Sequence, residues 1–205
     1  LIQYHATLVA PAWGPYSEPL ELDGTFIRVR HVDVREELGQ PWRMTIEVMT
    51  THPHFDPSRP AGSTFTLHML REDAANPGEN DGRFFHGVVA TTEYIGSFSE
   101  AYHARLLVLP TLGLLNNTCR SRIFQDSTVV EIVQEVAGEF LENRGGELDV
   151  TRLAQNLSTR DYCVQYEETD LSFVQRILAE DGITLGFEAD ESHERVVLFD
   201  DQDRF

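Results

Sequence analysis

The sequence has little positive charge, and this shortage excludes a class of partners. Its 205 residues include 16 Lys and Arg against 34 Asp and Glu, which gives a formal net charge of -18 at pH 7. A surface with this charge repels a phosphate backbone, and no run of Lys or Arg compensates for it. We therefore expect neither nucleic acid nor an anionic membrane surface as a partner.

Cysteine is scarce as well. Cys119 and Cys163 are separated by 44 positions, which matches no metal-binding or redox spacing. Two thiols in a chain of this size are ordinary for a reducing compartment, so we expect two small buried apolar residues. A disulfide between them is the alternative.

Long apolar runs are also missing. No stretch approaches the roughly 20 apolar residues that span a bilayer, so no membrane anchor is expected. The chain begins at Leu1 without an initiator Met and stops soon after an expected strand. We therefore expect it to be part of a longer protein.

Alternation of apolar and polar residues dominates the first half of the chain and predicts β-strands. In the clearest case, Trp42–Thr50, the apolar face consists of Trp42, Met44, Ile46 and Val48. Antiparallel strands that follow one another through short connections form a barrel or a sandwich. The predicted strands are 3–9, 26–34, 42–50, 64–70, 84–94 and 101–109.

The second half changes to helical periodicity. Thr169 can cap a helix over Asp170–Asp181, which Gly182 ends, and a capping box at Thr128–Glu131 begins another helix that Gly145-Gly146 ends. A short helix is expected at Asp149–Asn156. Strands are expected at 122–125, 163–166, 183–187 and 195–199, with the last two paired. The sequence thus predicts an α+β, predominantly β fold: an antiparallel barrel-like domain over 1–112, followed by an α+β module over 113–205.

One histidine cluster and two acidic clusters are candidates for chemistry. His52, His54 and Asp56 could begin a metal site, but no further ligand stands at a recognisable spacing, which favours a solvated loop. Two acidic groups could supply the carboxylate pair of a glycosidase. Helix capping explains the first group, and the second lacks the Gly and distal Glu of a calcium loop. These groups are Glu167, Glu168 and Asp170, and Asp200, Asp201 and Asp203.

Other catalytic motifs are absent from the sequence. It has no Gly-x-Ser-x-Gly and no phosphate-binding glycine loop, since Gly145-Gly146 is not followed by Lys and Ser or Thr. We therefore predict no catalytic, cofactor-binding or metal residue. Two alternatives stay open: a cell-wall hydrolase with a carboxylate pair, and a carbohydrate-binding β-module that stacks sugars on Trp13, Trp42 and Tyr94. Trp42 lies in phase with the inward face of its strand, which favours a core position instead.

Three stretches together resemble one family, the VgrG spike proteins of the bacterial type VI secretion system, which are similar to the baseplate hub proteins of contractile phage tails. The most specific of the three is Arg160–Val174, with its Cys-Val-Gln-Tyr, acidic, Asp-Leu and Phe-Val pattern. The other two are Gly82–Val89 and Ser121–Val133. The resemblance covers roughly Leu22–Asp200, and the chain departs from the family at Gly186, where aromatic residues are common, and in its acidic excess.

The resemblance implies a structural role. It implies a homotrimer whose hub makes a pseudo-sixfold ring on the hexameric Hcp tube. Baseplate proteins and secreted effectors or adaptors are the further partners that it implies. It implies no enzymatic activity and no cofactor for this region. It also implies assembly in the cytoplasm, followed by translocation out of the cell.

Overall fold

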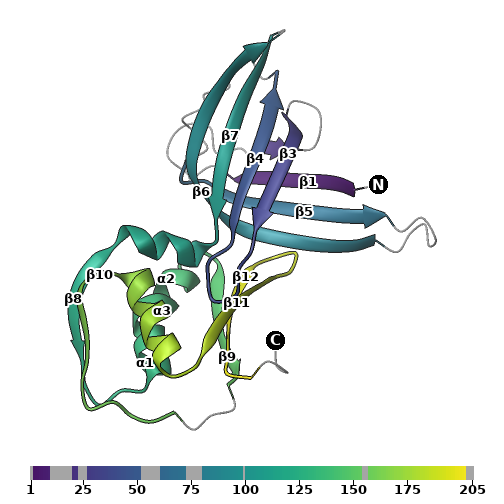
Figure 1. The fold of residues 1–205 in the computed structure, drawn as a ribbon. Helices are drawn as coiled ribbons and strands as arrows, with labels where there is room; N and C mark the ends of the chain where they lie inside the picture. The colour runs from purple at the N-terminus through teal and green to yellow at the C-terminus, as the bar shows by residue number, and fades with distance from the viewer. Residues whose placement is uncertain are drawn as a thin grey trace. The chain divides into compact units, whose positions relative to one another are not determined.

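The computed structural model describes residues 2–9, 20–22, 27–51, 61–72, 80–98, 100–153 and 157–201 (Figure 1). The chain divides into two compact units, each made of discontinuous segments. Unit 1 comprises Leu1–Arg35, Arg43–Leu109 and Ala189–Ser192, and unit 2 comprises Glu36–Trp42, Pro110–Glu188 and His193–Phe205. The predicted division into domains 1–112 and 113–205 stays a prediction.

Unit 1 is built on one antiparallel sheet with the strand order β2-β1-β5-β6-β7-β4-β3. Every strand predicted for this half of the chain is present, and β2 is an additional one. The strands are β1 (Ile2–Val9), β2 (Leu20–Leu22), β3 (Ile27–Arg35), β4 (Arg43–Thr50), β5 (Thr64–Glu72), β6 (Asn80–Phe98) and β7 (Ala101–Leu109).

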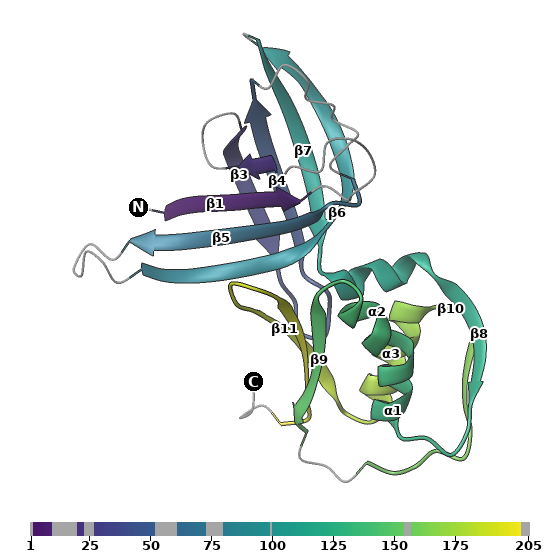
Figure 2. The ribbon, with the colours of Figure 1, turned by 180° about the vertical axis from the view of Figure 1, so that it is seen from behind.

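The long strand β6 makes this sheet curl. Its first part pairs with β5 as far as Val88, and its last part pairs with β7 from Val88 onward, with a register shift between Val89 and Thr91. A shift of this kind bends a strand and increases its twist. As a result β1 and β5 run across the direction of β4 and β7 (Figures 1 and 2), which gives the barrel-like curvature that the sequence predicts.

One face of the sheet carries the apolar core of unit 1. Met44, Ile46 and Val48 are buried on β4, as their alternation predicts. Burying side chains of this size contributes roughly 1.5–3 kcal/mol each. The core also includes Phe65, Leu67, Phe85, Ala104, Leu106 and Val108.

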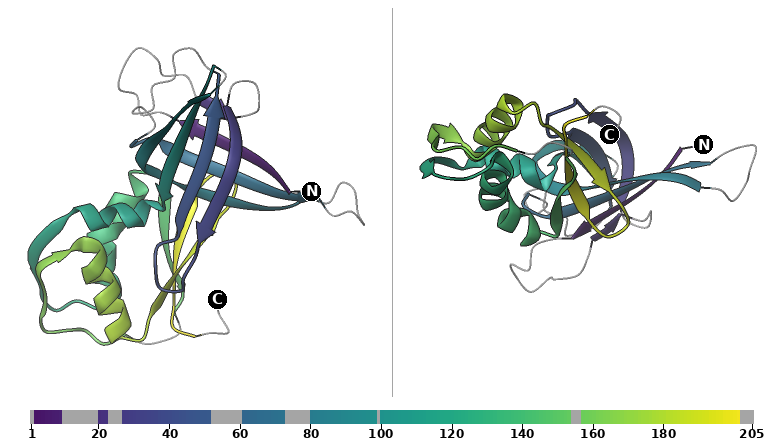
Figure 3. Two further views of the ribbon diagram at one scale, coloured as in Figure 1. Left: turned by 45° about the horizontal axis from the view of Figure 1, so that its top comes forward. Right: turned by 90° about the horizontal axis from the view of Figure 1, so that it is seen from below.

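Unit 2 places its helices between two small sheets (Figures 1 and 3). One sheet is the antiparallel pair β10-β8, and the other has the order β11-β12-β9 with β9 parallel to β12. The predicted pairing of β11 with β12 is confirmed. The strands are β8 (Cys119–Phe124), β9 (Gly146–Arg152), β10 (Cys163–Thr169), β11 (Thr184–Ala189) and β12 (Glu194–Phe199).

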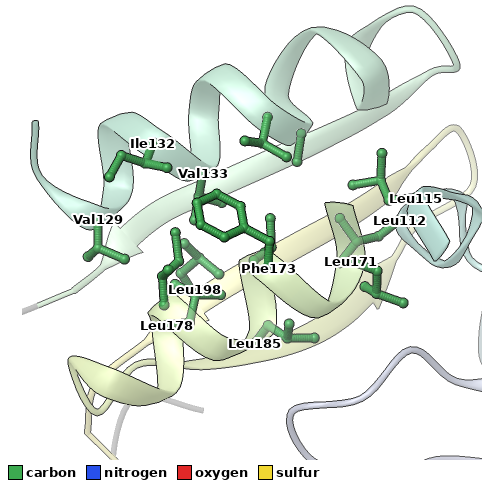
Figure 4. Packing of buried hydrophobic residues seen from close by; sticks show 14 of the residues in the cluster. Leu112, Leu115, Val129, Ile132, Val133, Leu171, Phe173, Leu178, Leu185 and Leu198 are labelled. Carbon is green, nitrogen blue, oxygen red and sulfur yellow. The ribbon is translucent and has the colours of Figure 1, made fainter. Parts of the chain in front are cut away.

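Two helical stretches and a 3-10 turn lie between these sheets, and their apolar side chains form the core of unit 2. The predicted helix after Thr128 runs as α1 (Val129–Val133), a π-helical segment η2 (Gln134–Gly138) and α2 (Glu139–Glu142), and the predicted helix after Thr169 is α3 (Asp170–Glu180). The 3-10 turn η1 spans Thr111–Asn117. Figure 4 shows Phe173 of α3 among Val133, Leu178 and Leu198 in the core of unit 2.

Two predictions for this half of the chain were wrong. A helix was expected at Asp149–Asn156, but residues 146–152 form β9, and residues 154–156 lie outside the described part. The hydrogen bonds that β9 makes with β12 are non-local and outweigh the weak local preference for a helix. Cys163 is buried as expected, whereas Cys119 is exposed.

The two cysteines are free. Cys163 pairs with Phe124 and Cys119 with Thr169, so the thiols lie at opposite ends of the β8-β10 ladder. Among the helices of the described residues, none is both long enough and apolar enough to cross a bilayer.

Candidate functional site

The histidine cluster suggested by the sequence lies outside the described residues, since 52–60 are not among them. The structure therefore does not test a metal site at His52, His54 and Asp56. Elsewhere in the described ranges, no group of three or more His, Cys, Asp or Glu side chains is placed to hold a metal ion.

Two of the three acids at the start of α3, Glu168 and Asp170, are held in ion pairs. Asp170 is buried and bound by Arg122, and Glu168 Oε1 accepts a hydrogen bond from Arg176 Nη2 at 2.6 Å. Glu167 is exposed, and its φ of 48° places it in the left-handed region at a bulge of β10. The three carboxylates thus have different environments and do not converge on one point.

The remaining candidates are also separated. Asp200 and Asp201 follow β12, and Asp203 lies outside the described residues. Of the possible sugar-stacking residues, Trp42 is buried and Tyr94 is exposed, while Trp13 lies outside the described part. A stacking platform made of these three is therefore excluded by the burial of Trp42.

The most specific sequence motif forms a buried polar network behind the ribbon β8-β10. Gln165, which is fully buried, accepts a hydrogen bond from Arg122 Nε at 2.8 Å and donates one to Asp170 Oδ1 at 2.8 Å. A second bond joins Gln165 Nε2 to the carbonyl oxygen of Glu168 at 3.1 Å. Asp170 also lies 3.7 Å from the guanidinium of Arg120. A buried charge that is paired and hydrogen-bonded in this way fixes the local conformation.

The sequence predicts only part of this network. Thr169 caps α3 as expected, with its hydroxyl accepting from Ser172 N at 3.1 Å. Asp170, by contrast, was explained by helix capping, and its burial and its ion pair with Arg122 were missed. The pairing of β8 with β10, which places Arg122 opposite Gln165, is the non-local fact that sequence reasoning lacked.

Two further arginines hold β10 and α3 together. Arg176 bonds Glu168 and Glu180 as well as the carbonyl oxygen of Val164, and its hydrogen bond with Glu168 is the main cause that raises its pKa. Arg160 bonds Glu180 at 2.8 Å and Asp181 at 2.7 Å. The bond from Arg160 is the main cause that lowers the pKa of Glu180. These contacts stabilise the fold of the motif.

One buried acid was not predicted at all. Glu194, at the start of β12, accepts a hydrogen bond from Thr111 N at 2.9 Å, while its second oxygen has no partner. Burial raises the pKa of this carboxyl to about 7. A perturbed acid of this kind is a candidate proton donor, but a glycosidase needs a second carboxylate facing it, and Glu194 has no acidic partner among its described contacts.

Comparison with known proteins agrees with a structural interpretation. A model of the phage tail baseplate hub (GPD) family matches residues 35–205. Two spike proteins of the type VI secretion system of Pseudomonas aeruginosa, VgrG1b and VgrG4b, are 27% and 31% identical to this chain over 87% and 91% of its length. These regions make up only 23% and 22% of the two relatives.

Solved structures show the same fold. A component of the E. coli type VI secretion system, described as similar to the T4 tail proteins gp27 and gp5, matches 86% of this chain and 49% of its own with a TM-score of 0.71 and 26% identity. A chain of a Francisella PdpA-VgrG complex matches 97% of this chain and 32% of its own, with a TM-score of 0.68 at 11% identity, which supports the fold alone. Because the family model covers residues 35–205, the chain belongs to the phage tail baseplate hub family, and it is similar to the hub region of VgrG spike proteins.

Proposed function

We propose that this chain trimerises as the hub of a type VI secretion spike and seats that spike on the hexameric Hcp tube, and that it catalyses no reaction. The structural role as a spike or baseplate hub follows from family membership. Trimer formation and binding to the tube are proposals that go beyond family membership, because the chain spans only about a quarter of the length of the curated relatives.

The observation that supports this proposal is that the central polar residues of the family motif, Gln165 and Asp170, are buried. In an enzyme, a specific polar motif lines a cleft where substrate can reach it. Here Gln165 and Asp170 are buried behind a β-ribbon and bonded to Arg122. Their arrangement maintains the shape of unit 2, which suits a part whose work is assembly.

The same proposal assigns the partners and the location. Hcp hexamers, baseplate proteins and a secreted effector or adaptor are the expected partners, with assembly in the cytoplasm and translocation by contraction of the machine. Among the relatives, a VgrG is named in complex with the protein PdpA, which supports protein partners for the hub fold.

The test uses the protein at its full natural length. Mass photometry should show a trimer, and negative-stain images of a mixture with purified Hcp tubes should show the protein at tube ends. A matched version that lacks residues 35–205 should neither cap tubes nor restore secretion to a strain without the protein. A monomer that leaves tube ends free would contradict the proposal.

A further inference from the structure

The outward face of the ribbon β8-β10 is apolar and exposed. Cys163 and Gln165 point inward and are buried, so the residues that alternate with them on this strand face outward. These are Tyr162, Val164 and Tyr166, and Ile123 lies directly opposite Val164 on β8. Tyr162, Tyr166 and Ile123 are 57%, 71% and 61% exposed. Figure 1 shows this ribbon on the outer side of unit 2.

The inner side of the ribbon is fixed, which makes the outer face a rigid platform. Phe124 stacks on Phe173 of α3 with ring centroids 5.5 Å apart, and the Arg122-Gln165-Asp170 network lies beside it. At the bulge, Glu167 N donates to Ser121 Oγ at 3.2 Å. A preorganised surface binds with a smaller entropy cost than one that must be ordered on contact.

Exposed acidic residues lie at both ends of the ribbon, beyond the residues that form the platform. The bridge between Ser127 and Arg160 continues the register of the ribbon, so Asp126 and Asp161 lie opposite each other at one end. Glu167 stands at the other end, and all three are exposed.

The neighbouring arginines do not neutralise these acids. In the described part of the chain, Arg120 and Arg122 pair with Asp170, while Arg160 and Arg176 pair with acids at Glu168, Glu180 and Asp181. No ion pair within the described ranges involves Asp126, Asp161 or Glu167. The platform therefore has an apolar centre and a negative rim.

From this combination we infer that the outward face of β8-β10 is a docking surface for a partner protein whose contacting segment carries apolar side chains between Lys or Arg residues. The apolar centre supplies the contact area, and the rim selects a basic segment over an acidic one. A second copy of this acidic chain fits the rim less well, because its net charge is -18. The inference rests on the proposed hub role, since it assigns one of the surfaces that the hub offers to partners.

Binding of labelled synthetic peptides to the full-length protein, followed by fluorescence anisotropy, tests the inference. The first peptide carries Val and Ile at alternating positions between pairs of lysines. The second has Glu in place of Lys, and the third has Ser in place of Val and Ile. Only the first should bind, and its affinity should fall as salt is raised.

Substitutions on the platform locate the binding. Ile123→Ser with Tyr166→Ser should weaken the first peptide at least about tenfold, and Asp126→Asn with Asp161→Asn about threefold. Phe98→Ser is the matched control, because Phe98 is a 75% exposed apolar residue of β6 and not part of the ribbon, and it should leave binding unchanged. If the double variant unfolds at a lower urea concentration than the parent, Tyr166→Ser alone replaces it in the binding measurement.

Three results would overturn the inference: no binding of the first peptide, equal binding of the first and third peptides, or equal loss in Phe98→Ser. Mass photometry of the same variants separates this inference from the hub role. If the Ile123→Ser, Tyr166→Ser protein loses its trimer, the platform is a contact between copies and the partner assignment is wrong. If peptide binding is absent while the trimer and Hcp binding persist, the docking inference alone fails.

Discussion

At the scale of single residues, Glu194 should make stability depend on pH. Its folded pKa is about 7 against an ordinary value of 4.5, so the folded protein holds this proton more tightly than the unfolded chain does. The associated stability is fully present below pH 4.5 and is lost as the pH rises through 7. The loss amounts to about 3 kcal/mol at alkaline pH.

Glu194→Gln removes this titration and keeps an oxygen that can accept from Thr111 N. We expect the variant and the parent to have similar free energies of unfolding at pH 5, and the variant to be more stable by about 3 kcal/mol at pH 8. Urea denaturation at both pH values measures the difference in free energy of unfolding between the variant and the parent. The contributions of the other titrating groups are the same in both proteins and cancel in this difference. An identical pH dependence of the two proteins would contradict the burial of Glu194 as an acid.

Arg122 is the second residue with a defined energetic role. Arg122→Met leaves the buried carboxylate of Asp170 without its main partner, and breaking a buried pair in this way costs about 3–5 kcal/mol. We expect the lower end, about 3 kcal/mol, because Arg120 lies 3.7 Å from Asp170 and can compensate in part. Adding Asp170→Asn should recover part of the loss. Urea denaturation of the two single variants and the double variant measures this coupling, and additive losses would show that the pair is not coupled.

At the scale of elements, the cap of α1 is the feature that the sequence predicts most directly. Thr128 Oγ1 accepts from Glu131 N at 3.3 Å, and Glu131 Oε2 accepts from Thr128 N at 2.7 Å. The bond from Thr128 N to the carboxylate, followed by the one from the Thr128 hydroxyl at 2.8 Å, lowers the pKa of Glu131. Thr128→Ala should therefore cost about 1 kcal/mol, while Thr128→Ser, which keeps the hydroxyl, should cost less than about 0.5 kcal/mol. Thermal unfolding of the two variants checks the order, and equal losses would mean that the methyl group of Thr128, not its cap, stabilises the helix.

Elements with local signals were predictable, and those that depend on distant partners were not. Thr169 and Gly182 delimit α3 in the sequence as they do in the structure, because a cap and a left-handed stop act on neighbouring backbone groups. The strand β9 was mistaken for a helix because its partner residues on β12 lie far along the chain, as with Gly146 and Glu194, and local propensity carries little information about such a pairing. The π-helical segment at Gln134–Gly138 had no signal that we identified.

At the scale of the whole molecule, each compact unit is made of discontinuous segments of the chain. Glu36–Trp42, between β3 and β4, belongs to unit 2. Within unit 2, Gly39 N donates to the carbonyl oxygen of Leu185 at 3.1 Å, and Gln175 Nε2 donates to the carbonyl oxygen of Gly39 at 2.9 Å. Neither bond could be anticipated from the sequence, because each joins residues more than a hundred positions apart.

The assignment of residues 36–42 to unit 2 predicts that this segment stabilises α3 and not the sheet of unit 1, whose strands β3 and β4 it connects. Replacing it with Gly and Ser residues of equal number removes the buried Trp42 side chain and the Gln40 side chain that accepts from Gln175 Nε2 at 2.8 Å, while the backbone groups of residue 39 stay in place. Losing a buried Trp alone costs about 3–5 kcal/mol, so the amides of α3 and β11 should exchange hydrogen for deuterium at least about a hundredfold faster. The amides of β5 and β6, in unit 1, should keep their protection.

Gln175→Ala should show a smaller effect on α3, and Gln134→Ala, which changes an exposed glutamine of η2, should show none. Faster exchange in β5 and β6 with α3 unchanged would assign the segment to unit 1, because only the unit that packs on 36–42 loses stability when its contacts are removed.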